Sequence, residues 1–258
     1  MMSAFVEINA VKIVGRAIQR AMDWQYPSRI ISRPGMGKTT ALRHFQQEHG
    51  AVYCTVKAQH KDTAGMYLML LEAYGKYAHG KTSRDHAQQI YRDLLRGRYN
   101  PESAEWEQGR HEAPLLVDEY QTLEVTALRE LLNIVEQCQI PLVLCGNGER
   151  LAKEPARQRA ALDQIWNRVR PTYRIDPPDF EDCRALAIEF NVEFDPAAYE
   201  ALASYGEQTS VRDLVCLLGE ARIIAGPGTI KLIHIETAVM TLHGDRRALK
   251  LLHSKETA

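Results

Sequence analysis

Apolar residues follow two spacings along the first two thirds of the chain, and each spacing predicts a different kind of element. Short runs rich in apolar and β-branched residues, typical of buried strands, lie at residues 29–32, 51–56, 115–117 and 141–145. Helices are expected around these runs, at residues 5–26, 38–49, 63–77 and 123–137. The stretch 100–112 is polar and predicts a loop. Strands that alternate with helices predict an α/β fold, with a parallel sheet between helices.

The pattern changes at residues 171–178, which contain Pro171, Pro177 and Pro178, and helical spacing follows to the end. Helices are expected at residues 180–190, 196–205, 211–225 and 230–242. The sequence therefore predicts two domains. Residues 1–175 form an α/β core, and residues 176–258 form a small all-helical lid with a basic C-terminal tail.

Composition narrows the class of protein. The 258 residues are 45% hydrophobic and 25% charged, and 32 Lys and Arg against 33 Asp and Glu leave a net charge of −1. This balance excludes a globally basic protein that coats nucleic acid, although a local basic stripe is compatible with it. No apolar run approaches the roughly 18 residues of a membrane span. The five cysteines form no CxxC pair and the nine histidines no metal-ligand spacing, so we expect a protein of a reducing compartment, the cytoplasm.

The strongest chemical signal is the octapeptide SRPGMGKT, which starts at Ser32 between a predicted strand and a predicted helix. This is the context and spacing of a P-loop, except that serine stands at the usual first glycine. Gly35 and Gly37 would let backbone N–H groups surround phosphate oxygens, Lys38 would reach the β- and γ-phosphates, and Thr39 would bind Mg²⁺. The alternative is a glycine turn with an incidental Lys-Thr. The expected nucleotide-binding residues are Pro34, Gly35, Met36, Gly37, Lys38, Thr39 and Thr40.

A second signal is the apolar run PLLVDE at residues 114–119, which ends in two acids as a Walker B strand does. Asp118 would hold Mg²⁺, largely through water, and Glu119 would orient and deprotonate the attacking water. The alternative is an acidic pair that a helix N-terminus attracts. The next apolar run ends at Asn147, which would lie beside the attacking water as a sensor residue if its strand pairs with the Walker strand. The alternative for Asn147 is a turn within Gly-Asn-Gly.

Arginines are the candidates for stabilising negative charge in the transition state. Residues 150–174 carry seven Lys and Arg against two acids. Arg168, or its neighbour Arg170, precedes the last core strand, where an arginine finger would reach the γ-phosphate of an adjacent subunit. A solvated basic face is the alternative. Arg212, at the start of a lid helix, could contact nucleotide phosphates when the lid closes.

Together these motifs resemble the AAA+ ATPases over most of the chain, from about Val11 through the lid. The sequence DEYQ at residues 118–121 and the short lid look most similar to the transposition ATPases of the MuB, TniB and TnsC family. The resemblance implies ATP and Mg²⁺ as cofactors, largely sequence-independent binding of double-stranded DNA, and self-assembly into a filament or ring. It also implies delivery of target DNA to a transposase, in a bacterial or phage-infected cell.

Other functions share these motifs. Helicase loaders and replication initiators carry the same catalytic elements, so a loader or initiator ATPase is the alternative function. A nucleotide-binding scaffold without turnover is disfavoured by Glu119, because a pure switch needs no base that activates water.

DNA binding is expected to fall to the core itself, because the chain begins almost at the ATPase motifs. Lys57 and Lys61 follow the second strand, where related ATPases line the filament interior. Lys81 and Arg84 lie in a second basic stretch, residues 76–98, with six Lys and Arg against two Asp. Such cations would follow phosphates without reading bases. For each residue taken singly, a solvated charged face is the alternative.

Overall fold

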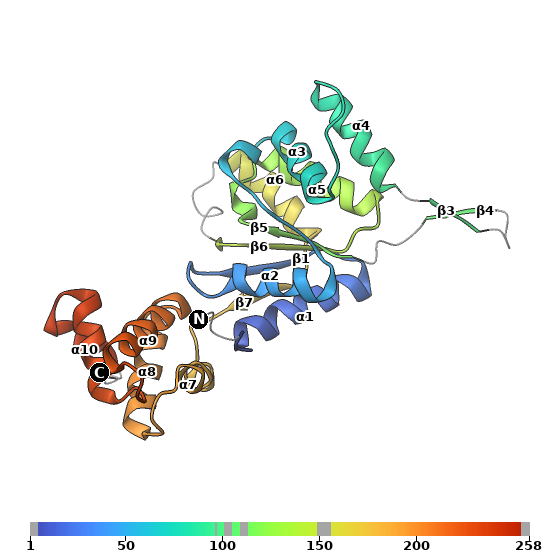
Figure 1. Cartoon of the computed structure of the whole chain (residues 1–258). Coiled ribbons are helices and arrows are strands. Elements are labelled where there is room, and N and C mark those ends of the chain that lie inside the picture. The colour runs from blue at the N-terminus through green and yellow to red at the C-terminus, as the bar shows by residue number, and fades with distance from the viewer. Residues whose placement is uncertain (1–4, 96, 101–104, 109–112, 149–155, 254–258) are drawn as a thin grey trace. The chain divides into compact units, whose positions relative to one another are not determined.

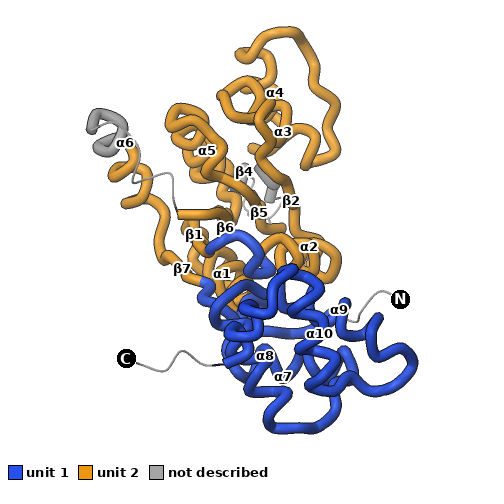
Figure 2. Tube along the Cα trace, turned by 90° about the vertical axis from the view of Figure 1, so that its left-hand side faces the viewer, with its two compact units in different colours: residues 1–12, 33–37, 175–258 blue, residues 13–32, 38–174 orange. Residues whose placement is uncertain are grey.

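The computed structural model describes residues 5–95, 97–100, 105–108, 113–148 and 156–253. The chain divides into two compact units, each discontinuous in sequence (Figure 2). The α/β unit comprises residues 13–32 and 38–174, and the helical unit comprises residues 1–12, 33–37 and 175–258. Residues 33–37 of the predicted phosphate loop thus group with the C-terminal helices. The contiguous division at 175/176 stays a prediction.

A five-stranded sheet forms the centre of the α/β unit, with its strands in the order β2-β5-β6-β1-β7 (Figure 1). The strands are β1 (Ser28–Ser32), β2 (Val52–Thr55), β5 (Leu115–Asp118), β6 (Leu142–Gly146) and β7 (Thr172–Ile175). β2 pairs with β5, β5 with β6 and β6 with β1, all in parallel. Every residue of β5 and β6 is buried, as expected for strands covered on both faces. The predicted α/β class is confirmed.

Helices cover both faces of this sheet. The helices of the unit are α1 (Asn9–Trp24, of which the part from Ile13 onward belongs to this unit), α2 (Lys38–His49), α3 (Thr63–Ala73), α4 (Ser83–Leu94), α5 (Val125–Gln137) and α6 (Ala156–Asn167). α1 and α2 lie on one side of the strands, and α3, α5 and α6 lie on the other (Figure 1). Two short 3-10 helices, η1 (Ala58–His60) and η2 (Tyr120–Thr122), follow the ends of β2 and β5. The carboxyl ends of the strands therefore lead directly into the turns that carry the candidate site.

Several elements differ from the sequence prediction. The polar stretch 100–112 is not a plain loop, because β3 (Gly97–Asn100) and β4 (Glu105–Gln108) pair as an antiparallel hairpin. The four-residue segments GRYN and EWEQ lack the apolar alternation that marks a half-buried strand, so periodicity missed them. Helix α4 was also missed, although Thr82 and Asp85 form a capping box at its start.

The helical unit contains α7 (Phe180–Glu189), α8 (Pro196–Gln208), α9 (Val211–Ala225), α10 (Leu232–His243) and the 3-10 segment η4 (Arg246–Leu252). Side chains cap three of its helices: Asp179, Asp195 and Ser210 each accept a backbone N–H of the first turn. The N-terminal segment joins this unit through the backbone N–H of Asn9, which donates to Asp182 at 2.7 Å. In the part of the chain that the structure describes, no helix is long and apolar enough to cross a membrane.

Candidate active site

The predicted phosphate loop connects β1 to α2 in the backbone conformation that its glycines permit. Gly35 and Gly37 have φ angles of +82° and +84°, values that L side chains rarely adopt. Helix α2 begins at Lys38, directly after the loop. The first turn of a helix presents backbone N–H groups toward the segment that precedes it, and this is the arrangement that binds phosphate at a helix N-terminus. Of the other predicted loop residues, Met36 is buried, whereas Pro34 and Thr40 are exposed.

The Lys38 side chain is buried and is held by the residue that departs from the P-loop pattern. Its Nζ donates to the carbonyl oxygen of Ser32 at 3.2 Å and to the Ser32 hydroxyl at 2.9 Å. Both residues are about 6–7% exposed. A buried ammonium must be hydrogen-bonded, and Ser32 meets that need in this structure. Binding of a phosphate by Lys38 would therefore compete with Ser32.

Thr39 and Asp118 meet although 79 positions separate them in the sequence. The Thr39 hydroxyl donates to Oδ2 of Asp118 at 2.6 Å, and the Tyr53 hydroxyl lies 3.3 Å from the same oxygen. Asp118 is 1% exposed, at the end of β5. A hydroxyl and a carboxylate in contact are the oxygen donors that Mg²⁺ prefers, so the residues present fit a Mg²⁺-nucleotide complex. The predicted Thr39–Asp118 pair is thus brought together by the fold.

The buried carboxylate of Asp118 also affects its neighbours. Burial, with Asp118 nearby, raises the pKa of the Cys54 thiol to about 12 and that of Cys145 well above its ordinary value. Burial likewise raises the pKa of Tyr53. These groups stay protonated near neutral pH, so neither thiol offers a thiolate to a metal or a substrate.

Glu119 follows Asp118 in a left-handed backbone conformation, with φ of 58°. Its backbone N–H donates to Oδ1 of Asp118 at 3.0 Å, and its carboxylate accepts a hydrogen bond from Nε2 of Gln121. The oxygen of the same Gln121 amide accepts the backbone N–H of Asn147 at 3.2 Å. β5 and β6 are neighbours in the sheet, with Asp118 beside Cys145. The predicted base and the predicted sensor are therefore linked by Gln121, a residue of the DEYQ segment to which the sequence assigns no role of its own.

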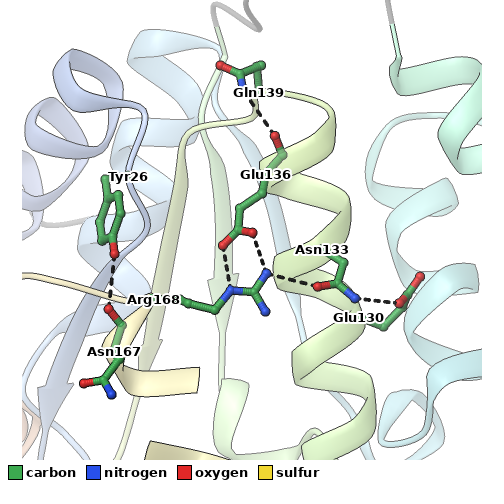
Figure 3. A network of polar contacts seen from close by, with 7 residues as sticks. All are labelled: Tyr26, Glu130, Asn133, Glu136, Gln139, Asn167 and Arg168. Carbon is green, nitrogen blue, oxygen red and sulfur yellow. Dashed lines mark hydrogen bonds and ion pairs between the residues drawn. The ribbon is translucent and has the colours of Figure 1, made fainter. Parts of the chain in front are cut away.

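The predicted arginine finger is engaged within its own subunit (Figure 3). Arg168 donates from Nε and Nη2 to the two carboxylate oxygens of Glu136, at 2.8 and 2.5 Å, and from Nη2 to Asn133 at 3.0 Å. This pair of hydrogen bonds raises the pKa of the Arg168 guanidinium. Arg170 is exposed, and its Nη2 lies 3.2 Å from the side-chain oxygen of Asn167. A role of Arg168 in a neighbouring subunit would require it to leave Glu136.

Arg212 belongs to the helical unit and contacts the phosphate loop through its backbone. Its N–H, in the first turn of α9, donates to the carbonyl oxygen of Gly35 at 2.9 Å. A Cβ at Gly35 would lie 2.6 Å from the hydroxyl of Ser210, the residue that caps α9. The Arg212 side chain is exposed. The sequence indicates a role for the Arg212 side chain, whereas the contact in the structure is made by its main chain.

The four candidate DNA-binding cations all have exposed side chains. Lys57 and Lys61 flank η1, whereas Lys81 precedes the N-cap residue of α4 and Arg84 lies in the first turn of that helix. Arg150 and Lys153, from the basic stretch 150–174, lie outside the described residues.

Known proteins resemble this chain in sequence and in fold. Residues 26–153 match the family model of the AAA domain. Mu-like prophage FluMu DNA transposition protein B of Haemophilus influenzae is 22% identical over 209 residues, which cover 79% of this chain and 67% of that protein. Among solved structures, ORC2 of Aeropyrum pernix aligns with a TM-score of 0.58 and 13% identity, over 96% of this chain and 68% of that one. A point variant of RuvB of Thermotoga maritima aligns with a TM-score of 0.53 and 17% identity, over 93% of this chain and 70% of that one.

Proposed function

Since this chain is a MuB-like AAA+ protein, we propose that it hydrolyses ATP and binds double-stranded DNA, assembles on that DNA and presents it to a transposase. The relative from Haemophilus influenzae is named a DNA transposition protein, which supports the direction of this proposal. The contacts within the α/β unit support the proposed ATP hydrolysis. The exposed lysines beside the strand that carries Asp118 support the proposed DNA binding.

Five side chains would carry the hydrolysis. Lys38 would exchange the oxygens of Ser32 for phosphate oxygens, and Thr39 and Asp118 would exchange their mutual hydrogen bond for Mg²⁺. Bound Mg²⁺ supplies positive charge that stabilises the transferring phosphoryl group. Glu119 would take a proton from the attacking water, and Asn147, at the end of the adjacent strand, would help to position that water.

The observation that carries the DNA-binding proposal is the attachment of the Lys57–Lys61 segment to the catalytic strand. At one end, Val56 donates its backbone N–H to the carbonyl oxygen of Asp118 at 2.9 Å. At the other end, Glu124 donates its backbone N–H to the carbonyl oxygen of Lys61 at 2.7 Å. Phosphates bound by these exposed lysines would therefore act on a backbone that is hydrogen-bonded on both sides of Glu119. This arrangement favours hydrolysis that responds to DNA.

Assembly follows from the need for a cation in trans. We assign this role to Arg168, with Arg170 as its neighbour, because in this fold the cation usually arrives from the adjacent subunit. The bidentate pair with Glu136 would hold Arg168 until subunits associate. DNA that aligns subunits would then stimulate turnover.

Co-sedimentation with long duplex DNA of random sequence tests the proposal. With ATP, the protein should pellet with the DNA. The double substitution Lys57→Glu and Lys61→Glu should remove most of the protein from the DNA pellet while ATP binding persists. Lys12→Glu with Lys231→Glu is the matched control, because it changes the net charge equally at two exposed lysines elsewhere. Affinity for DNA should fall with salt, with a slope of roughly 0.9 per phosphate contact on logarithmic axes.

The outcomes separate the candidate functions. Pelleting of the Lys57/Lys61 variant as efficiently as the control would move the DNA contact elsewhere. No pelleting of the unaltered protein at low salt, together with ATP-dependent binding to a replicative helicase, would replace the proposal by the loader function.

A further inference from the structure

Gln121 occupies the corner between the two strands that carry the proposed base and the proposed sensor. It lies in η2, two residues after Glu119, and its amide contacts both sides of the corner. The amide nitrogen donates to the carboxylate of Glu119, and the amide oxygen accepts the backbone N–H of Asn147 at 3.2 Å. One side chain therefore joins the ends of β5 and β6.

The two contacts fix the orientation of the amide. A carboxylate can only accept and a backbone N–H can only donate, so one orientation of the Gln121 amide satisfies both partners. No other uncharged side chain of this length offers a donor and an acceptor in this way. Glutamate would keep the acceptor for Asn147 but would face Glu119 with a second carboxylate oxygen.

The end of β6 leaves space for this amide. A Cβ at Gly146 would overlap the amide oxygen of Gln121 and would lie 3.0 Å from the ring of Tyr120. Gly146 is therefore required for the close approach of Gln121 to the backbone beside Asn147, because any side chain would occupy the place of the amide oxygen. Gly146, the first glycine of the Gly-Asn-Gly sequence, thus has a packing role besides turn formation.

We propose that Gln121 is a positioning residue, which orients the carboxylate of Glu119 for proton abstraction and ties it to the strand end at Asn147. The proposal rests on the proposed function, in which Glu119 is the base. A carboxylate has two oxygens with about four lone-pair sites, so a hydrogen bond to Oε2 leaves the other oxygen able to accept a proton from water. A displacement of Asn147 would reach Glu119 through the same amide.

Two variants separate the two contacts of Gln121. Gln121→Met is of similar length and removes both, whereas Gln121→Glu keeps the acceptor for Asn147 and loses the donor to Glu119. Both should lower kcat roughly 10- to 100-fold, the usual effect of removing a group that orients an active-site residue, with KM for ATP unchanged. Hydrogen exchange of the Asn147 amide should be faster in Gln121→Met by roughly fivefold and unchanged in Gln121→Glu.

A double variant and a control distinguish positioning from a general structural effect. In a Glu119→Gln background, Gln121→Met should cause no further loss of kcat, because the residue it positions is already disabled. Gln47→Met makes the same substitution at an exposed glutamine of α2 and should leave kcat and exchange at Asn147 unchanged.

Three results would overturn the inference: unchanged kcat in Gln121→Met, increased kcat, or an equal loss of kcat in the presence and absence of Glu119. The first two results overturn the inference when Glu119→Gln is inactive in the same assay. If Glu119→Gln itself retains turnover, the assignment of the base has failed, and the proposed function is revised instead.

Discussion

The proposed catalytic edge of the sheet and the exposed lysines beside it hold their polar groups in opposite ways. At the catalytic edge, Lys38 is hydrogen-bonded to Ser32, Thr39 to Asp118 and Glu119 to Gln121. The candidate DNA-binding cations extend from the surface with exposed side chains, and it is the backbone beneath Lys57 and Lys61 that is fixed. Function at the first region should depend on individual contacts, whereas function at the second should depend on summed charge, which salt screens.

The largest expected effect comes from Lys38→Ala, which removes the buried ammonium of the phosphate loop. We expect no nucleotide binding at concentrations that saturate the unaltered protein and, as a consequence, no ATP-dependent DNA binding. Titration with a fluorescent ATP analogue measures the first effect and co-sedimentation the second. Near-normal ATP affinity in a folded Lys38→Ala protein would falsify the P-loop assignment. DNA binding that survives without nucleotide would show that the two regions act independently.

Glu119→Gln should separate hydrolysis at the catalytic edge from DNA binding by the exposed lysines. The substitution keeps the shape of the side chain and removes the base, so turnover should fall roughly 100- to 10,000-fold while ATP still binds. DNA binding should persist or last longer, because the ATP-bound state accumulates. Steady-state ATPase rates and dissociation from duplex DNA measure these effects. A rate within a few-fold of that of the unaltered protein would mean that another residue activates the water.

Arg168→Ala tests whether a third region, on a neighbouring subunit, completes the catalytic edge. We expect unchanged ATP binding and turnover lowered roughly 10- to 100-fold, the effect of losing one hydrogen bond to a charged group. Mixing this variant with Lys38→Ala should restore part of the activity, because one subunit supplies an intact arginine and the other an intact pocket. A mixture as inactive as its components, while both co-assemble on DNA, would exclude action of Arg168 in trans.

Ser32→Gly should give the smallest effect, and it tests a single hydrogen bond at the proposed catalytic edge. The change restores the usual first glycine of the P-loop and removes the hydroxyl that binds Lys38 at 2.9 Å. Since one competing hydrogen bond is worth about 1 kcal/mol, ATP should bind roughly fivefold more tightly. Calorimetric titration with a non-hydrolysable analogue measures the change. Weaker binding would indicate that the Ser32 hydroxyl itself contacts phosphate.

Local patterns predicted the parts of this molecule whose chemistry is local. The apolar runs at β5 and β6 indicated covered parallel strands, and the SRPGMGKT segment indicated a glycine-containing loop between a strand and a helix, because each property is carried by consecutive residues. Phosphate binding by this loop stays a prediction. The pairing of the two strands, on which the role of Asn147 depended, is confirmed.

Contacts between polar residues that belong to no motif could not be predicted from the sequence. Gln121 follows the acidic pair with no periodic or compositional mark, and Glu136 lies 32 positions before the arginine that it binds. Such pairs become visible after the strands and helices are placed in space. The antiparallel pair of β3 and β4 was missed for a related reason, since its pairing rests on backbone hydrogen bonds between polar segments.

The hydrogen bond from Arg212 to Gly35 bears on how far this protein can be divided into modules. Residues 33–37 pack with the C-terminal helices, so the loop that identifies the nucleotide site is supported by a segment encoded some 175 positions later. A fragment that ends at residue 174 would keep the whole octapeptide but lose the α9 turn against which Gly35 rests. We therefore expect that a fragment which keeps the conformation of residues 33–37 must extend at least through α9, and that exchange of either segment between relatives must carry the other with it.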